Sequence, residues 1–338
     1  MNVFIVGGRG NIGQEVALGL IRQAEISQVI LGDMDADPAG LRLRLRKNQK
    51  ISMVKIDAND AQTLTGILTG AKADVVVNCA GPFLTTAPAV VRACVGARIN
   101  YIDVCDDHET VARLYASPLD RAAREAGITV LTGMGSDPGT NNLIAKSYAD
   151  RLDRVAEVAL YWVVGIAELT GPAAWAHSFR MTQGKIPQFL DGRLEYVEGG
   201  TGEERVAFPE PLGNCLLHFV GHPQPLTLPR YIPGLRTVVV KGTILPADRP
   251  AASGLKVVVK GERQGAQVTC TAEMVGAMGA GTGLPAAIAV RMMGAGEIPA
   301  HGLVAPEGCI DPEKFLTALR QNGAEIRETE TVTPRPAP

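Results

Sequence analysis

The chain has 338 residues, of which 46% are hydrophobic and 20% charged, and its formal net charge is −2. This length predicts two domains, because a single hydrophobic core rarely grows beyond about 250–300 residues. The balanced charge excludes a general basic field for a polyanion, so nucleic acid is not an expected partner, and the hydrophobic content excludes a disordered chain.

Residues 1–140 alternate short apolar runs with helical patterns. The apolar runs are rich in valine and isoleucine and are expected as strands at Val3–Val6, Val29–Leu31, Met53–Ile56, Val75–Val77, Tyr101–Val104 and Thr129–Leu131. The helical patterns begin near Ile12, Ala61, Ala87 and His108. Strands separated by helices form parallel βαβ units. We therefore predict a Rossmann-type α/β domain with a doubly wound parallel sheet.

One segment of this domain, Leu41–Arg46, reads LRLRLR. Strict alternation is typical of a strand. The segment lies between two strands of the parallel series, however, where the chain must cross over the sheet. We therefore expect a helix here.

Residues 141–280 have a different pattern. A helix is expected from Asn142 to about Leu152, a strand at Val155–Val164 and a helix from Ala173 to Gln183. Further strand-like runs follow one another at Val206–Phe208, Leu216–Val220, Thr237–Lys241, Leu255–Lys260 and Gln267–Met274. Consecutive strands predict a second α+β domain with a mixed or antiparallel sheet, which we assign to substrate binding and dimerisation.

The last part of the chain is expected to return to the first domain. Residues 281–330 are predicted to form C-terminal helices and a strand, with Pro285 at the first position of a helix. Residues 331–338 are expected to be a disordered tail.

A glycine-rich segment follows the first strand and opens the first helix, and it reads Gly8-Arg9-Gly10-Asn11-Ile12-Gly13. In a G-x-G-x-x-G turn the first glycine permits the tight turn and the second lets the backbone approach a pyrophosphate. The third packs the helix against the sheet. The pattern predicts dinucleotide binding; a glycine turn that binds no nucleotide is the alternative.

Asp33 ends the second strand, and its carboxylate is suited to the ribose hydroxyls of NAD. NADP stays open as the cofactor, because Arg9, or the arginines at positions 42, 44 and 46, can reach a 2′-phosphate. A solvated face is the favoured interpretation of those three arginines. The other expected cofactor contacts follow the third and fourth strands, and they are Asp57, Ala80, Gly81, Pro82 and Phe83.

Two families of nucleotide-binding enzymes carry motifs similar to those of this chain. Short-chain dehydrogenases carry an Asn-Ala-Gly motif similar to Asn78–Gly81, but they need a Tyr-x-x-x-Lys pair that this chain lacks. Several segments instead resemble the saccharopine dehydrogenase family: Gly8–Gly13, Val75–Phe83, Tyr101–Asp103, Gly135–Asn142, Thr282–Ala287 and Gly302–Glu307. The resemblance is closest over the first 145 residues and returns at 280–320. It implies nicotinamide-dependent chemistry at a carbon–nitrogen bond, usually in a homodimer; saccharopine reductases, lysine dehydrogenases and carboxynorspermidine synthases are members.

Polar residues follow the fifth and sixth strands, and ligands of open α/β sheets bind at the carboxyl ends of strands. Asp106 or Asp107 can bind a substrate ammonium, and His108 can carry a proton. Helix capping explains the same acidic residues equally well. Further candidate substrate contacts are Cys105, Ser136, Asp137, Thr140 and Asn141. The segment that holds the last four can bind a substrate carboxylate at a helix N-terminus, or serve as a hinge.

Two more candidates lie in the second domain. His177 is a possible acid–base group and Arg180 a possible partner for a carboxylate, unless their helix belongs to a core or an interface. His218 and His222 are four residues apart in an expected strand and loop, so we predict no metal site there.

These features predict an NAD(P)-dependent oxidoreductase acting on a C–N bond of an amino acid or opine-like substrate in the cleft between the domains. Imine reduction and oxidative deamination both fit. A non-catalytic NAD(P)-binding sensor is the alternative. No apolar run reaches the length of a membrane-spanning helix, the start of the chain lacks a signal-peptide pattern, and the six cysteines show no paired spacing. We therefore expect a cytoplasmic protein with reduced thiols and no membrane partner.

Overall fold

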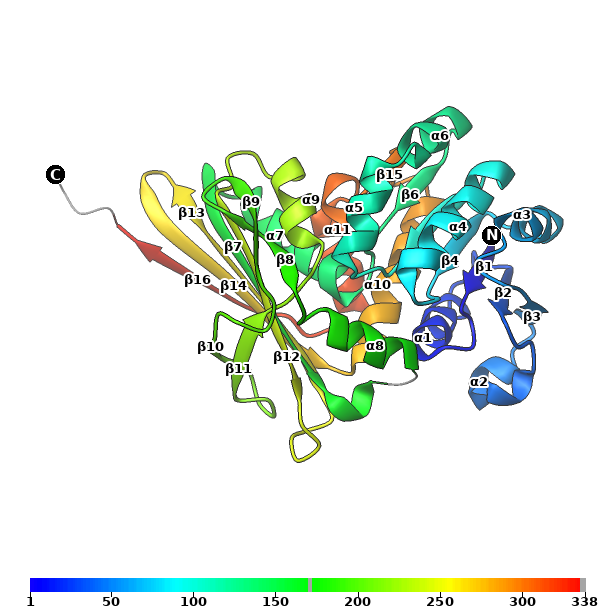
Figure 1. Ribbon diagram of the computed structural model, residues 1–338, viewed down its shortest axis with the longest axis horizontal. Coiled ribbons are helices and arrows are strands. Elements are labelled where there is room, and N and C mark those ends of the chain that lie inside the picture. Colours follow the sequence, from blue (N-terminus) through cyan, green and yellow to red (C-terminus); the bar gives the residue numbers. More distant parts are fainter. Residues whose placement is uncertain (170–171, 335–338) are drawn as a thin grey trace. The chain divides into compact units, whose positions relative to one another are not determined.

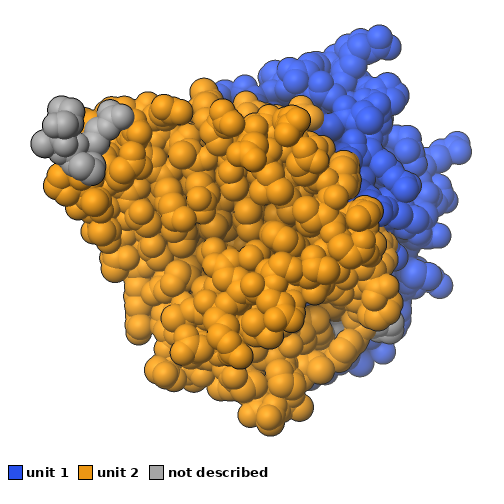
Figure 2. Space-filling model, turned by 60° about the vertical axis from the view of Figure 1, so that its left-hand side comes forward, with its two compact units in different colours: residues 1–136, 279–309 blue, residues 137–278, 310–338 orange. Residues whose placement is uncertain are grey.

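The computed structural model describes residues 1–169 and 172–334. The chain divides into two compact units, which Figure 2 colours separately. Unit 1 comprises Met1–Ser136 and Gly279–Cys309, and unit 2 comprises Asp137–Met278 and Ile310–Pro338. No helix in the described part of the chain is both long and apolar enough to cross a membrane.

Unit 1 is built on a sheet of seven parallel strands in the order β15-β6-β5-β4-β1-β2-β3 (Figure 1). The strands are β1 Asn2–Val6, β2 Gln28–Asp33, β3 Ile51–Lys55, β4 Val75–Asn78, β5 Asn100–Asp103, β6 Thr129–Leu131 and β15 Gly302–Val304. The strand order reverses between β1 and β4, which is the point where doubly wound sheets bind ligands. The predicted Rossmann-type fold is confirmed.

Helices cover both faces of this sheet. They are α1 Asn11–Leu20, α2 Leu43–Arg46, α3 Ala61–Gly70, α4 Phe83–Ala97, α5 His108–Ala116, α6 Leu119–Ala126 and α10 Met278–Gly294, with short 3-10 turns at Pro38–Gly40 and Pro306–Gly308. On one face, leucines of α3 and valines of α4 pack against the strands. Elsewhere in the unit α10 packs closely against α1, since a Cβ at Gly283 would lie 2.5 Å from the Cβ of Glu15.

Unit 2 is built on a nine-stranded mixed sheet. Its main path is β10-β11-β12-β7-β13-β14-β16, and β8 joins β12 to β9. Only the pair β12–β7 is parallel among the described strands of this sheet. The strands are β7 Arg154–Gly165, β8 Lys185–Leu190, β9 Arg193–Glu198, β10 Glu204–Ala207, β11 Asn214–Phe219, β12 Thr237–Leu245, β13 Ser253–Arg263, β14 Ala266–Gly276 and β16 Arg327–Thr333. The predicted second domain with a mixed sheet is confirmed.

The helices of unit 2 are α7 Asn141–Ala149, α8 Pro172–Arg180, α9 Gln224–Tyr231 and α11 Pro312–Gln321, with a 3-10 turn at Ile166–Glu168. The chain enters the unit through a short helical turn at Ser136–Thr140. Helix α7 packs against β7 and β13, and α9 packs against β8 and β12. The opposite face of the sheet carries its own apolar cluster, with Tyr161 and Val163 of β7 among its members.

The structure differs from the sequence-based expectation at the C-terminal end. Helix α10, strand β15 and the 3-10 turn at Pro306–Gly308 return to unit 1, whereas α11 packs against α7 and β16 pairs with β14 in unit 2. Strand β16 also includes residues 331–333 of the expected tail. Pro285 lies inside α10, which begins at Met278, so its expected place at the start of a helix is wrong.

Candidate functional site

The glycine turn at the start of α1 is tight. The backbone N–H groups of Gly7 and Gly8 donate to the carbonyl of Gly32 at 2.9 and 3.1 Å, and the N–H of Gly10 donates to the carbonyl of Gly7 at 3.1 Å. A Cβ at Gly13 would lie 2.3 Å from the Gly7 carbonyl oxygen, so only glycine fits where helix and turn meet. At Gly10 the nearest heavy atom to such a Cβ would be that same oxygen, at 3.2 Å, so Gly10 is less crowded than Gly13.

The N-terminus of α1 is well suited to an anion. Gly10 occupies the N-cap position, and among the described residues no side chain caps the helix there. Its first turn, with Asn11 and Ile12, contains no acidic residue. The first backbone N–H groups of a helix have no intrahelical acceptor and lie at the positive end of its dipole. The turn therefore fits the pyrophosphate of a dinucleotide.

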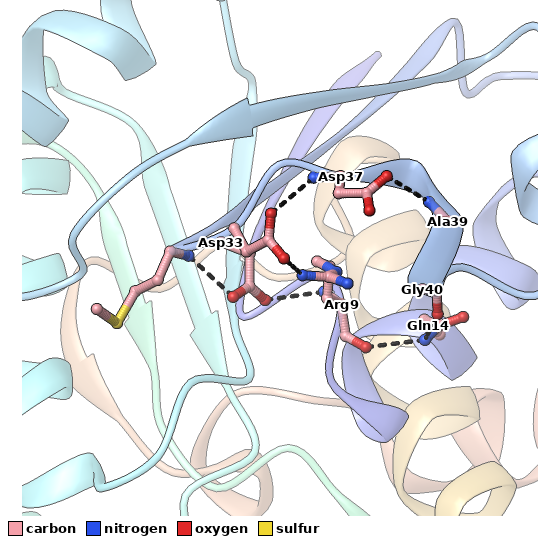
Figure 3. Close-up of polar contacts among 8 residues, drawn as sticks. Arg9, Gln14, Asp33, Asp37, Ala39 and Gly40 are labelled. Carbon is pink, nitrogen blue, oxygen red and sulfur yellow. Dashed lines mark hydrogen bonds and ion pairs between the residues drawn. The ribbon is translucent and has the colours of Figure 1, made fainter.

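The predicted ribose ligand, Asp33, lies beside this turn. One carboxylate oxygen accepts the N–H of Arg9 at 2.9 Å, and the other accepts the N–H of Met34 at 2.9 Å. The Arg9 guanidinium pairs with Asp35 rather than with Asp33. Figure 3 shows Arg9 lying between Asp33 and the loop that carries Gly40. Asp33, at the end of β2, and Arg9, in the glycine turn, therefore lie next to each other. Both are placed where the ribose of a dinucleotide is expected.

Gln14 fixes the loop that follows. Its amide nitrogen donates to the carbonyl of Arg9 at 2.8 Å, and its amide oxygen accepts the N–H of Arg42 at 2.8 Å. The Arg42 guanidinium donates to the side-chain oxygen of Asn11 at 2.6 Å and pairs with Glu15. The sequence did not single out Gln14, because its role depends on a loop folded back from residue 42. The side chain of Arg42 therefore contacts α1 through Asn11 and Glu15.

The remaining predicted cofactor contacts lie at the ends of β3 and β4. At the end of β4, the N–H of Ala80 donates to the Asn78 side chain at 3.1 Å, and the segment to Phe83 leads directly into α4. Gly81 and Pro82 lie within this segment. Asp57 follows β3, the outermost strand, where it is exposed and accepts the N–H of Asn59 at 2.9 Å. The Ala80–Phe83 segment, next to the strand reversal, is therefore better placed than Asp57.

A buried carboxylate organises the carboxyl ends of β5 and β6. Asp103 is fully buried and accepts hydrogen bonds from the Tyr101 hydroxyl at 2.7 Å, the N–H of Gly133 at 2.7 Å and the N–H of Cys105 at 3.1 Å. The Thr132 hydroxyl donates to it as well, at 3.0 Å. Burial raises the pKa of Asp103 above its ordinary value. Asp103 is a positioning residue for both loops, and only its place in the Tyr101–Asp103 motif marked it in the sequence.

Asp103→Ala is expected to lower the free energy of unfolding by roughly 3 kcal/mol, because two buried N–H groups lose their acceptor. Asp103→Asn is the matched control, since its amide oxygen can still accept. A raised folded pKa gives stability that is present below the unfolded pKa and lost as pH rises through the folded value. Denaturant titrations across the acid range should therefore show wild type losing stability relative to the Asn variant as pH rises. A pH-independent difference would contradict this.

The candidates after β5 divide into two groups. Cys105 is fully buried, and this burial raises the pKa of the thiol well above the usual value, which fits a packing role. Asp107 is also buried and caps α5 by accepting the N–H of Thr110 at 2.8 Å, which is the capping role considered as the alternative. Asp106 and His108 are only partly buried. These two are the candidates from this loop that can meet a ligand.

The segment Ser136–Asn141 passes from unit 1 into unit 2. The hydroxyl of Ser136 lies 3.2 Å from that of Thr282 within unit 1. In unit 2, Asp137 accepts a hydrogen bond from the Gln224 amide and lies 3.5 Å from Nδ1 of His222. Thr140 and Asn141 are almost completely buried. Neither polar atom of the Asn141 side chain has a hydrogen-bond partner among the described residues.

Comparison with known proteins agrees with the geometry of unit 1. Residues 3–131 match the family model described as the saccharopine dehydrogenase NADP-binding domain. This part of the chain is similar to the nucleotide-binding domain of that family. The predicted resemblance is thus confirmed for the region that holds the glycine turn, Asp33 and Asp103.

Curated relatives align with this saccharopine dehydrogenase-type domain. Carboxynorspermidine synthase of Vibrio cholerae is 25% identical over 120 residues, which is 32% of this chain and only 28% of that protein. A probable mitochondrial saccharopine dehydrogenase-like oxidoreductase of Arabidopsis thaliana is 30% identical over 87 residues, 26% of this chain and 18% of that protein. The aligned part is thus less than a third of each relative's length.

Similarity of fold extends over both units. Apo saccharopine dehydrogenase (L-Glu forming) from Saccharomyces cerevisiae has a TM-score of 0.74 at 16% identity, covering 98% of this chain and 99% of that one. C. glutamicum DAP dehydrogenase in complex with DAP has a TM-score of 0.53 at 17% identity, with 96% and 99% covered. At these identities the likeness concerns the fold alone.

Two candidate residues of unit 2 lie on one helix, and His222 lies beside a residue that the sequence did not connect with it. His177, partly buried, and Arg180, exposed, both lie on α8. His222, considered in the sequence only as a metal ligand, instead lies beside Asp137. The structure shows no group of three or more His, Cys, Asp or Glu residues arranged for a metal within its described ranges. No local sequence signal links Asp137 to His222, because they are far apart in the chain.

Proposed function

We propose that this protein is an NAD(P)-dependent oxidoreductase that acts on a C–N bond of an amino acid or opine-like substrate. The observation that carries the proposal is the glycine turn Gly8–Gly13, with an α1 N-terminus that no described side chain caps, in a region similar to the saccharopine dehydrogenase NADP-binding domain. A nicotinamide cofactor exchanges hydride with substrate when bound. The residues of the chain orient the reactants and handle the protons.

The cofactor-binding residues follow from unit 1. The backbone of Gly8–Gly13 holds the pyrophosphate, and Asp33 accepts hydrogen bonds from the ribose. The segment Ala80–Phe83 lies at the strand reversal, where the cofactor chain passes. We place NAD ahead of NADP, because a 2′-phosphate would lie beside the Asp33 carboxylate. Structures of similar fold contain either cofactor: an engineered D-amino acid dehydrogenase is bound to NADP+, and GenD2 is in complex with NAD.

The names of similar proteins support the substrate class. They include carboxynorspermidine synthase, saccharopine dehydrogenase (L-Glu forming) and DAP dehydrogenase in complex with DAP. In this chain Asp106 and His108, partly buried after β5, are suited to contact an amine and to carry a proton. The assignment to a homodimer is part of the same proposal and is checked by sedimentation velocity.

The experiment combines binding with turnover. NADH and NADPH are titrated against the protein by fluorescence. Reduction of NAD+ and NADP+ is then followed with the standard amino acids and diaminopimelate, and oxidation of the reduced cofactors with amine and keto-acid pairs. Binding with turnover of at least one panel member is the expected result. Binding without any turnover would favour a sensor, and absence of binding would overturn the proposal altogether.

A further inference from the structure

Strand β9 forms a free edge of the sheet in unit 2. It pairs with β8 and with no other strand in the described part of the chain. Leu194 and Tyr196, which are 40% and 56% exposed, lie on this strand. Each is paired with an apolar residue of β8, Leu194 with Phe189 and Tyr196 with Pro187. Because side chains alternate along a strand, these four residues form one apolar face at the edge of the sheet.

The backbone of β9 turns towards the free edge at the same two residues. In an antiparallel pair, residues that exchange hydrogen bonds alternate with residues that do not. Pro187 has no N–H group, so Pro187 and Tyr196 form a pair without this exchange. Leu194 lies two residues along and belongs to the same kind of pair. The N–H and C=O groups of Leu194 and Tyr196 therefore face away from β8, where no described element supplies a hydrogen-bond partner.

The hairpin that carries this edge is held on unit 2 by hydrogen bonds. At its tip, the N–H of Gly192 donates to the carbonyl of Arg236 at 2.8 Å. On β8, the fully buried Gln188 side chain accepts the N–H of Val240 at 2.8 Å and donates to the carbonyl of Val220 at 3.3 Å. The edge is therefore already extended and fixed, which lowers the entropy cost of adding a further strand.

A second copy of this chain presents the same strand. Antiparallel pairing of two β9 strands about a two-fold axis is self-complementary, because each strand meets an identical one. The apolar residues select the register of this pairing. With Glu195 opposite its own copy, Leu194 of each chain lies opposite Tyr196 of the other, so both exposed apolar side chains gain an apolar partner. The same register brings together the outward-facing N–H and C=O groups of these two residues.

The charges on the other face of β9 fit this register as well. Arg193 and Glu195 lie on that face, and within one chain their side chains form an ion pair at 3.7 Å. In the two-fold pair Glu195 lies opposite its own copy and diagonally next to Arg193 of the second copy. The repulsion of the two carboxylates is therefore offset by two arginines near each of them. A pair centred on Tyr196 would instead place the apolar Leu194 opposite Glu198.

Strand β16, at another edge of this sheet, fits a copy of itself less well. Two of its residues on one face are Glu328 and Glu330, and both already form ion pairs with arginines of their own chain. Its exposed apolar residue, Val332, lies next to the last residue of the strand. Val332 can lie opposite its own copy only if the ends of the two strands pair. The contact is therefore assigned to β9.

We propose that unit 2 forms a symmetric dimer by antiparallel pairing of β9 with β9 of a second copy, which joins the two sheets. This inference rests on the homodimer in the proposed function and names its surface, but it requires neither cofactor nor substrate. Pairing of six-residue strands buries less surface than a standard interface of about 1,200–2,000 Å². We therefore expect a reversible dimer with a dissociation constant of about 1–100 µM.

Sedimentation velocity at protein concentrations across this range tests the surface. Wild type should shift from monomer to dimer as its concentration rises. Tyr196→Lys places a charge opposite Leu194 of the second copy and should raise the dissociation constant at least about tenfold. Val332→Lys, at the β16 edge, and Trp175→Lys, on α8, are matched controls at exposed residues and should dimerise as wild type does. An unchanged constant in Tyr196→Lys, or the same loss in a control, would overturn the inference.

Charge reversal at low ionic strength tests the register. Arg193→Glu surrounds the two-fold axis with carboxylates alone, and Glu195→Arg surrounds it with guanidinium groups alone. Each change should weaken dimerisation at least about tenfold. The double variant restores the alternation of charge and should dimerise within about threefold of wild type. Recovery in the double variant supports the register, whereas single changes without effect would contradict it.

A cysteine at the axis gives a test that does not depend on affinity. Glu195→Cys places each thiol beside its own copy, where the Cα atoms of a non-hydrogen-bonded pair are about 4.5 Å apart, within reach of a disulfide. Val197→Cys, on the same face, is the matched control, because its two copies would be about 13 Å apart along the strands. Oxidation with copper–phenanthroline should link Glu195→Cys into dimers but neither Val197→Cys nor wild type. A dimer that is not linked through position 195, or is linked through position 197, would refute the pairing.

These outcomes separate this inference from the proposed function. A wild type that stays monomeric throughout would overturn both the homodimer and this surface, and the proposed oxidoreductase activity would stand. A dimer that no change on β9 weakens would show that the surface alone is wrong. Absence of cofactor binding would overturn the proposed activity without affecting any of the assembly measurements.

Discussion

Gly10→Val is expected to weaken binding of NADH and NADPH by at least about 100-fold, which corresponds to about 2.8 kcal/mol. Gly10 has a φ of −62° and a ψ of 160°, a conformation that valine adopts readily. An added Cβ would lie 3.2 Å from the Gly7 carbonyl oxygen, which has to shift by a few tenths of an ångström. We expect the variant to fold, and its melting temperature is measured beside binding. The valine methyl groups would occupy the space through which the pyrophosphate reaches the backbone N–H groups. Fluorescence titration measures the dissociation constants.

Two further variants make this result specific. Gly66→Val places the same side chain on α3 of the same unit, where an added Cβ meets no heavy atom within 4 Å, and it should bind cofactor as wild type does. Gly13→Val brings the Cβ to 2.3 Å from the Gly7 carbonyl oxygen and should lower the melting temperature as well as binding. If Gly10→Val binds cofactor within threefold of wild type, the glycine turn is not the pyrophosphate site.

The nucleotide-binding unit was predictable because its signals are local. Strands buried on both faces appear as continuous valine and isoleucine runs, and the intervening helices begin and end at recognisable residues. Leu41–Arg46 shows where topology outweighs periodicity. Its alternating pattern suggests a strand, but the parallel neighbours β2 and β3 require a crossover, and α2 forms at Leu43–Arg46.

Unit 2 was predicted less completely, for two reasons. The hairpin β8–β9 turns at Asp191-Gly192, where φ is 51° and 80°. An Asp-Gly pair is a strong hairpin signal, but the sequence-based prediction has no strand at residues 185–198. The attachment of α11 and β16 to unit 2 has no local signal, because it depends on pairing with β14.

The proline at 285 shows the limit of a local rule. A proline at this position predicts the start of a helix, whereas α10 begins earlier and continues through Pro285.

The residues of the candidate site also differ in whether a local sequence signal reveals them. The glycine turn and Asp33 are recognisable from spacing, since the fold fixes how far apart they lie in sequence. Asp103 and His222 owe their polar environment to partners that other elements bring to them: the loop after β6 for Asp103, and the turn before α7 for His222. Their polar contacts become apparent only when the buried side chains are placed together. Conversely, Cys105 and Asp107 have the right residue types but are used in packing and capping.

Asp33→Ala is expected to shift cofactor preference towards NADP by at least about tenfold, measured as the ratio of the dissociation constants for NAD+ and NADP+. Two like charges near a protein surface repel each other by a few kcal/mol, and the substitution removes the carboxylate nearest to a 2′-phosphate. Arg9 is available to the phosphate, because its ion pair with the largely exposed Asp35 is of the kind that contributes little. Both titrations are made at one ionic strength, since salt screens such charges.

The contribution of each charge can be separated by three companion variants. Asp37→Ala removes an acidic group that caps the 3-10 turn at Pro38–Gly40 without contacting Arg9, and it should leave the preference unchanged. Asp35→Ala frees the Arg9 guanidinium and should favour NADP, although less than Asp33→Ala does, because Asp33 still faces the ribose. Adding Arg9→Ala to Asp33→Ala should remove most of the gain. If Asp33→Ala leaves the ratio unchanged, Asp33 is not the ribose ligand, and the loop from Asp35 to Arg42 must discriminate between the cofactors instead.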